Sequence, residues 1–301
     1  MTNGNIGSVQ PMMEASTPGL FAGLSGRYRK PMERQAIDAP LVVAIHGGTY
    51  SSAYFDLHGY SLLDRAASVG IPIIAVDRPG YGDSAMLPAS EQTLRGQARF
   101  LSIALEDAWT RFGGSTNGIV LIGHSIGAAI AALIASEPCK FPLLGLAISG
   151  VCLRTPPHFQ GAWASLPDTP LVDLPVPLKD EVMFGPPGSF DASMPEISHQ
   201  ANTTVPKVEI LDIVSTWPAE VQQILPKINV PVHYRQAEVD HLWIVDQEEI
   251  RGFKSALSQS PRVDAEMMRA TGHCMDFHRI GAALQLQQLG FALQCAIEKK
   301  G

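Results

Sequence analysis

Residues 119–127 read Ile-Val-Leu-Ile-Gly-His-Ser-Ile-Gly, an apolar run that ends in a glycine-flanked serine, and a helical run follows over 126–136. A strand that turns sharply into a helix needs small residues at the turn, because a Cβ at Gly123 or Gly127 would crowd the neighbouring strand or helix. Such a turn exposes Ser125 at the N-terminus of the helix, where free N–H groups favour developing negative charge. The stretch therefore predicts that Ser125 is a nucleophile rather than a residue of an ordinary turn.

Short apolar runs alternate with longer helical patterns on both sides of this turn, which is typical of a parallel sheet built from strand–helix–strand units. The expected strands are residues 41–45, 71–76, 119–122, 143–148, 230–235 and 262–267. Apolar residues recur at intervals of three and four from Leu94 to Phe112, which predicts an amphipathic helix that ends before Gly113. A last helix is expected over about 276–297. No strand is recognisable in residues 1–40.

The segment between the fourth and fifth of these strands has a different character. Residues 155–231 contain thirteen prolines in seventy-seven positions and little clear periodicity. We expect residues 151–229 to form a cap inserted into one core domain made of residues 1–150 and 230–301, with a flexible linker between two domains as the alternative. Large apolar side chains, which a solvated linker would not expose, favour the cap. They are Trp163, Met183, Phe184, Phe190 and Trp217.

Composition excludes several classes of protein. The 301 residues are 46% hydrophobic and 17% charged, with 22 basic and 29 acidic side chains and a net charge of −7. A nucleic acid or an anionic membrane is therefore not expected as a partner. No apolar stretch reaches the ~18 residues of a membrane span, and residues 1–16 lack a secretory pattern, so a cytoplasmic location is expected. The four cysteines lack metal-binding spacing, so we expect free thiols and no metal site.

A serine nucleophile requires a histidine base and a carboxylate, in the chain order serine, acid, histidine. The strand at 230–235 leads into a loop that holds Glu238 and Asp240. Asp240 is the predicted acid because it lies far enough into the turn to bend back toward the end of the sheet. Glu238 remains the alternative acid, and a solvated surface role is its other interpretation.

The predicted base is His273, in the loop Thr271-Gly272-His273 after the last expected strand. Its alternative role is to cap the final helix. His278 lies within the predicted helix and His241 lies beside the predicted acid, so both are weaker candidates.

Two backbone N–H groups are needed to hold an oxyanion. The N–H of Ile126 is one, at the start of the helix. The other is expected from the loop His46-Gly47-Gly48-Thr49 after the strand at 41–45, where Gly48 is favoured and Thr49 is the alternative. We expect His46 to brace this loop by hydrogen bonds rather than to act as the base.

The motif Gly-His-Ser-Ile-Gly and the segment Asp77-Arg78-Pro79-Gly80-Tyr81-Gly82-Asp83-Ser84 together resemble the α/β-hydrolase superfamily over roughly residues 41–297. The resemblance implies an α/β fold with a mostly parallel eight-stranded sheet, helices on both faces and a cap inserted after the sixth strand. It also implies catalytic groups at the carboxyl ends of strands. The Pro-Gly turn is structural in that family, so Arg78 and Asp83 are assigned no chemistry.

Within that family, a serine rather than an aspartate at the turn disfavours dehalogenation and epoxide opening. We expect a serine hydrolase that cleaves a small or medium carboxylic ester through an acyl-enzyme, with a small-molecule substrate and no metal or organic cofactor. Hydrolysis of a thioester, lactone, amide or carbon–carbon bond remains open, as does a non-catalytic ligand-binding homologue. Nothing in the sequence indicates an oligomeric state.

The candidate substrate pocket is apolar. Its expected side chains could equally belong to the core. They are Tyr54, Phe55, Trp163, Met183, Phe184, Trp217 and Met275.

Overall fold

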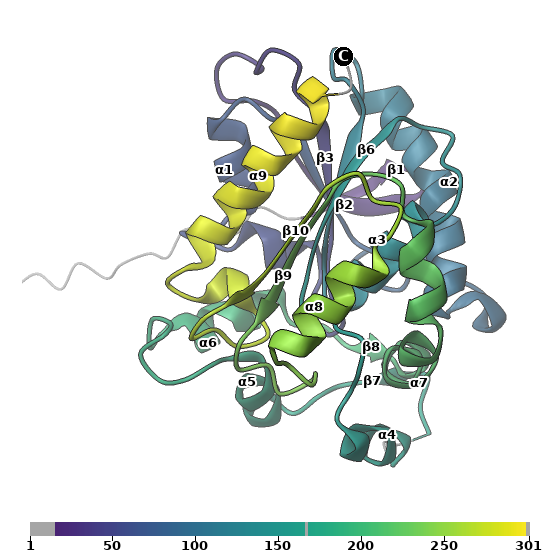
Figure 1. The fold of residues 1–301 in the computed structure, drawn as a ribbon, viewed down its shortest axis with the longest axis vertical. Coiled ribbons are helices and arrows are strands. Elements are labelled where there is room, and N and C mark those ends of the chain that lie inside the picture. Colours follow the sequence, from purple (N-terminus) through teal and green to yellow (C-terminus); the bar gives the residue numbers. More distant parts are fainter. Residues whose placement is uncertain (1–15, 166–167, 299–301) are drawn as a thin grey trace, which may run out of the picture.

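The computed structural model describes residues 16–165 and 168–298. Residues 1–15, which we expect to carry no secretory signal, lie outside the described residues. Within that part of the chain, eight strands form one sheet in the order β1-β2-β4-β3-β5-β6-β9-β10, with helices on both faces (Figure 1). The strands are β1 (Thr17–Phe21), β2 (Leu24–Arg29), β3 (Leu41–Ile45), β4 (Ile73–Val76), β5 (Ile119–His124), β6 (Leu143–Ser149), β9 (Val232–Ala237) and β10 (Val263–Met268). The helices are α1 (Leu62–Ser68), α2 (Leu94–Phe112), α3 (Ile126–Ala135), α4 (Pro157–Ala164), α5 (Val176–Met183), α6 (Met194–Ser198), α7 (Lys207–Ile224), α8 (Gln247–Ala256) and α9 (Gly281–Glu298). Two short strands, β7 (Leu171–Val172) and β8 (Val205–Pro206), pair separately.

The strands β4, β3, β5, β6, β9 and β10 are parallel to one another, whereas β1 and β2 form an antiparallel hairpin at one edge, and β2 also pairs antiparallel with β4. The sequence reading found no strand in residues 1–40, and the structure corrects it. The pattern was hidden because β2 (Leu24–Arg29) reads Leu-Ser-Gly-Arg-Tyr-Arg and buries the polar side chains of Ser25 and Arg27. An apolar run is the signal for a strand covered on both faces, and β2, the second strand from the edge of the sheet, lacks one.

The central strands are covered on both faces, which is why they read as unbroken apolar runs. Leu41, Val43 and Ile45 of β3 pack in one cluster with residues of α2 and α3. Val42 and Ala44 pack in a second cluster, with residues of α1 and α9 on the opposite face. The alternation along one strand therefore divides the core into two layers. The loops that follow the parallel strands all lie at one edge of the sheet, where the carboxyl ends of these strands meet.

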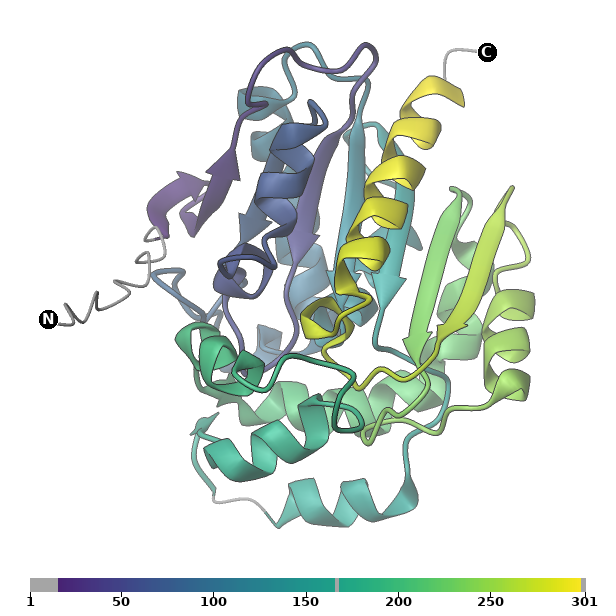
Figure 2. The same ribbon diagram turned by 90° about the vertical axis from the view of Figure 1, so that its left-hand side faces the viewer.

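Residues 157–224 lie together beyond the carboxyl ends of the parallel strands (Figure 2). This segment is more regular than its prolines suggest, since it forms four α-helices. The helices α4, α5 and α6 each have proline at the first or second helical position. A proline there loses no hydrogen bond and its fixed φ suits the helix, so these prolines start helices instead of breaking them. No helix among the described residues is both long enough and apolar enough to span a bilayer.

Candidate active site

Ser125 lies on the sharp turn between β5 and α3 with φ 55° and ψ −125°, a strained backbone conformation for a residue with a side chain. The flanking glycines are required as expected. A Cβ at Gly127 would lie 2.1 Å from the carbonyl oxygen of Ile45, and one at Gly123 would lie 2.7 Å from the Cα of Ala128. This close packing of strand and helix holds the serine at the carboxyl edge of the sheet, where its side chain is half-buried.

The structure brings Ser125, His273 and Asp240 together. His273 lies in the loop after β10, and its Nε2 is 2.9 Å from Ser125 Oγ. Its Nδ1 is 2.8 Å from Asp240 Oδ2, and both side chains are buried. Asp240 is fixed in turn, because its Oδ2 accepts from Gln236 Nε2 at 2.7 Å and its Oδ1 accepts from the Leu242 N–H at 2.9 Å. This geometry can pass a proton from a hydroxyl to an imidazole whose orientation is held by a carboxylate.

The other candidate acids and bases lie elsewhere. Glu238 is exposed and accepts a hydrogen bond from the Ala270 N–H at 2.7 Å, so it braces the turn after β10. His241 is exposed. His278 precedes α9, and its Nε2 accepts from the N–H groups of Gly272 and Gly185 at 2.9 and 3.0 Å. It therefore holds the loop that carries His273.

His124, the residue before the serine, supports the imidazole from one side. Its ring centroid is 5.0 Å from that of His273, and its other side stacks on Tyr54 at 4.7 Å. Burial, together with the neighbouring His273 and His46, lowers the pKa of His124 well below its usual range. A neutral ring at this position adds packing to the site without adding a positive charge.

The loop His46–Thr49 passes directly beside the serine. A Cβ at Gly47 would lie 2.9 Å from Ser125 Cβ, and one at Gly48 would lie 2.9 Å from Ile126 Cδ1. Ile126 is the first residue of α3, so its N–H has no acceptor within the helix. Gly47 therefore lies against Ser125, and Gly48 lies against the side chain of Ile126.

His46 braces this loop, as expected. Its Nδ1 is 2.7 Å from Gly47 O and its Nε2 accepts from the Arg78 N–H at 3.1 Å. Burial and, next, the charge of Arg78 lower the pKa of His46 to about 3. The ring therefore stays neutral and keeps one donor and one acceptor in use.

Arg78 and Glu209 are a structural link that the sequence reading missed. The Arg78 guanidinium is fully buried and donates to the carbonyls of His46 and Gly47, each at 3.0 Å. It also donates to Glu209 of α7 at 2.9 Å, and Tyr81 OH donates to the same carboxylate oxygen. The segment 151–229 is therefore tied to the loop beside the serine. A charged residue in the Asp-Arg-Pro-Gly turn was the one signal in the sequence, and its distant partner was invisible there.

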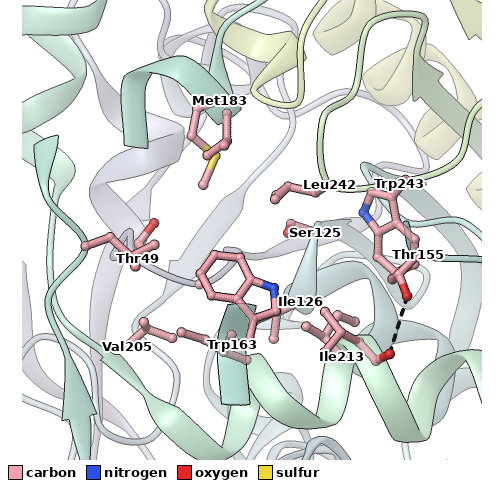
Figure 3. A pocket seen from close by; sticks show the side chains of 15 residues that line it. Thr49, Ser125, Ile126, Thr155, Trp163, Met183, Val205, Ile213, Leu242 and Trp243 are labelled. Atoms are coloured by element: carbon pink, nitrogen blue, oxygen red, sulfur yellow. Dashed lines mark hydrogen bonds between the residues drawn. The ribbon is translucent and has the colours of Figure 1, made fainter. Parts of the chain in front are cut away.

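A pocket opens over Ser125 between the sheet edge and the segment 151–229 (Figure 3). It holds about 590 Å³ of space free of protein atoms, part of which is open to solvent. Among the described residues, no charged side chain lines it, and the side-chain hydroxyls belong to Ser125, Thr49 and Thr155. The lining residues are Gly48, Thr49, Ser125, Ile126, Thr155, Trp163, Leu174, Val182, Met183, Val205, Ile210, Ile213, Val214, Leu242 and Trp243.

Trp163 and Met183 line the pocket, but the other five expected pocket residues do not. Those five pack in the core instead; they are Tyr54, Phe55, Phe184, Trp217 and Met275. Their polar atoms explain part of this. Tyr54 OH donates to Asp276 at 3.0 Å, and Trp217 Nε1 donates to the carbonyl of Cys152 at 2.8 Å, so both rings are anchored beneath the pocket. Most of the lining comes from smaller aliphatic residues, such as Val205, which carried no distinctive signal in the sequence.

The described residues contain no group of three or more His, Cys, Asp or Glu side chains arranged to hold a metal ion. The four cysteines are unpaired, and Cys274, next to His273, is buried. Burial raises the pKa of the Cys274 thiol to about 12, so the thiol stays protonated at neutral pH.

Comparisons with known proteins agree with this architecture. A model of the alpha/beta hydrolase family matches residues 42–282. Protein phosphatase methylesterase 1 of Bos taurus is 28% identical over 114 residues, which is 38% of this chain and 28% of that protein, so the match spans less than a third of the curated relative.

Two solved structures are similar over nearly their whole length. A thermophilic esterase from Thermogutta terrifontis has a TM-score of 0.65 and 17% identity, with 95% of this chain and 99% of that one covered. A monoacylglycerol lipase from Paleococcus ferrophilus has a TM-score of 0.64 and 17% identity, with 90% and 99% covered. At this identity the similarity establishes a shared fold.

Proposed function

The chain belongs to the alpha/beta hydrolase family, and on that premise we propose that it is a serine hydrolase that cleaves an uncharged carboxylic ester through an acyl-enzyme. The observation that carries the proposal is the pair of contacts Ser125 Oγ to His273 Nε2 at 2.9 Å and His273 Nδ1 to Asp240 Oδ2 at 2.8 Å. Three residues from three separate loops meet in the order of groups that nucleophilic catalysis needs.

In the proposed reaction, His273 takes the Ser125 proton as the serine oxygen attacks the ester carbonyl. The N–H groups of Gly48 and Ile126 hold the oxyanion, and Asp240 stabilises the imidazolium. His273 then gives its proton to the departing alcohol. Water attacks the acyl-enzyme by the same route, with His273 again the base, and releases the carboxylic acid.

We assign residues 151–229 to a cap that covers the reacting groups. Nine of the fifteen pocket-lining residues come from this segment, and they supply most of the apolar surface. A pocket without charged side chains favours an uncharged substrate, because an ionic group would lose its hydration there and gain no partner. Its lining of aliphatic and aromatic side chains suits an ester with a small or medium alkyl or aryl body.

A fluorophosphonate probe with intact-mass detection tests the proposed chemistry. We expect one adduct on Ser125 in the wild type, no adduct in Ser125→Ala and strongly slowed labelling in His273→Ala. A panel of p-nitrophenyl and methyl esters, thioesters and lactones then identifies the scissile bond. Folded wild-type protein that takes no adduct would contradict the hydrolase and favour a ligand-binding homologue.

A further inference from the structure

Thr49, the residue after Gly48, has a left-handed backbone with φ +62°. This region is unfavourable for a residue branched at Cβ, so the surrounding structure must hold it there. Thr49 lines the same pocket as Ser125, and the loop residues before it, Gly47 and Gly48, pack against Ser125 and Ile126. Strain of this kind at a pocket wall points to a function for the side chain or its peptide.

Lys179 of α5 is the residue that holds Thr49. Its Nζ donates to the Thr49 carbonyl oxygen at 2.6 Å and also to Asn202 Oδ1. The same Nζ lies 3.5 Å from the centre of the Tyr50 ring, a cation–π contact. The Thr203 N–H donates to the same Thr49 oxygen at 3.0 Å.

Folding stability alone does not account for this lysine. Its exposed fraction is 2%, and no ion pair joins it to a carboxylate in the part of the chain that the structure describes. Burial lowers the pKa of Lys179 to about 7, against the opposing effect of Cys274, Asp180 and Asp173. Burying an ammonium group without a counter-charge is unfavourable, so a compensating role is expected.

A role that would compensate for burying Lys179 is to fix the position of the Thr49 hydroxyl. Thr49 is 4% exposed, and its Oγ1 has no hydrogen-bond partner among the described residues. It lines the pocket with Ser125 and Ile126, and Figure 3 draws it on the wall opposite Trp243. The hydroxyl of Thr155, by contrast, donates to the Val214 carbonyl at 3.4 Å. A buried hydroxyl without a partner at the wall of an apolar pocket gains a hydrogen bond when a polar atom of a ligand reaches it.

We propose that the Thr49 hydroxyl is a further donor to the substrate carbonyl oxygen as that oxygen becomes an oxyanion, and that Lys179 is the positioning residue that keeps Thr49 in place. The proposal rests on the proposed ester hydrolysis and adds a side-chain donor to the two backbone N–H groups. It makes completion of the oxyanion site depend on α5, which belongs to the segment 151–229.

Three substitutions at one position test the donor. Thr49→Val removes the hydroxyl at constant shape, and Thr49→Gly removes it while relieving the strained φ, so the second variant keeps the test valid if the first folds poorly. Both should lower kcat for p-nitrophenyl butyrate about 100-fold with KM changed less than about threefold, while Thr49→Ser stays within about fivefold of wild type. Thr204→Val, the same exchange outside the pocket, is the control.

The affinity for an inhibitor that forms a tetrahedral adduct gives a second measurement, which would not change if Thr49 had only a structural role. The affinity for an alkyl trifluoromethyl ketone, which forms such an adduct with a serine, should fall in Thr49→Val by about the same factor as kcat/KM. Affinity for the product p-nitrophenol should change little, because it has no acyl oxygen to place in the oxyanion site.

Lys179→Met tests the positioning residue. We expect a folded protein whose unfolding free energy is unchanged or higher, with kcat about tenfold lower. If Lys179 acts through Thr49, the double variant Thr49→Val/Lys179→Met should fall no more than about threefold below Thr49→Val alone. Losses that multiply in the double variant would overturn this role.

The outcomes separate this inference from the proposed function. If the wild type hydrolyses the ester and labels at Ser125, but Thr49→Val and Thr49→Gly keep full kcat, the inference alone is wrong. A rise in KM at constant kcat would also overturn it, because it would place the hydroxyl on the bound substrate rather than on the oxyanion. A wild type that neither hydrolyses esters nor labels would remove the proposed function and this inference with it.

Discussion

Replacing Asp240 by asparagine should lower kcat for ester hydrolysis about 10⁴-fold and leave the protein folded. The Leu242 N–H donates to Asp240 Oδ1 at 2.9 Å, and only the carbonyl oxygen of an asparagine can accept there. The asparagine NH₂ therefore takes the place of Oδ2, facing His273 Nδ1 at about the present 2.8 Å.

That arrangement selects the wrong tautomer of the base. With Nδ1 accepting, the ring proton of His273 moves to Nε2, which faces Ser125 Oγ and can no longer take its proton. Gln236 can accommodate the change, because its Oε1 is buried without a partner in the described structure and can turn toward the new NH₂. Activity is thus lost because His273 has the wrong tautomer, and not because the protein unfolds. A 10⁴-fold fall in kcat corresponds to about 5 kcal/mol in the activation free energy.

The assay is hydrolysis of p-nitrophenyl butyrate, with thermal unfolding measured on the same samples. Glu238→Gln is the matched control, and its kcat should stay within about twofold of wild type because the Glu238 side chain is exposed. Asp240→Asn activity within tenfold of wild type, or a large loss in Glu238→Gln, would refute the reasoning and reassign the acid.

Three further predictions concern packing, pH dependence and the pocket. Gly127→Ala should not fold, because its Cβ would lie 2.1 Å from a backbone oxygen of β3, whereas Gly290→Ala, with open space at its Cβ in α9, should gain up to about 1 kcal/mol; soluble yield and urea unfolding check both. Burial and then the charge of Arg235 lower the pKa of His233 to about 4. The unfolded chain, with its ordinary value of 6.5, therefore binds the proton first on acidification, and about 2 kcal/mol of stability should be lost between pH 7 and 5. Urea titrations should find a smaller loss in His233→Met, and an equal loss would contradict this origin. Trp163→Ala should shift the preferred acyl chain to longer esters, whereas Trp217→Phe should keep the wild-type profile; identical profiles for Trp163→Ala and wild type would remove that ring from the pocket.

The core of the fold was predictable because its signals are local. The apolar runs that became β3, β5 and β6 are buried on both faces, and such burial requires apolar residues at every position. The hairpin β1–β2 was missed because its strands lie at the edge and its stability depends on pairing with β4, a contact over about fifty residues. Pairing with a strand so distant in the sequence does not require a regular pattern of apolar residues in the hairpin itself.

The pocket was only partly predictable for a related reason. Large aromatic residues were natural candidates, yet Tyr54 and Trp217 have hydrogen-bond partners that draw them into the core. The side chains that line the pocket, such as Val205 and Ile213, are ordinary aliphatic residues whose position depends on where β8 and α7 lie over the edge of the sheet. Neither fact can be derived from the order of residues alone.

The sequence by itself determined the turn at Ser125, since glycines at 123 and 127 and an apolar strand before them admit only one local geometry. It also indicated which loops would meet that turn, because parallel strands bring their carboxyl ends to one edge. The tertiary structure alone decided that Lys179 donates a hydrogen bond to the Thr49 carbonyl and that Glu209 forms an ion pair with Arg78. These contacts join residues about 130 positions apart. Their geometry is fixed by the packing of whole elements, which no short stretch of chain encodes.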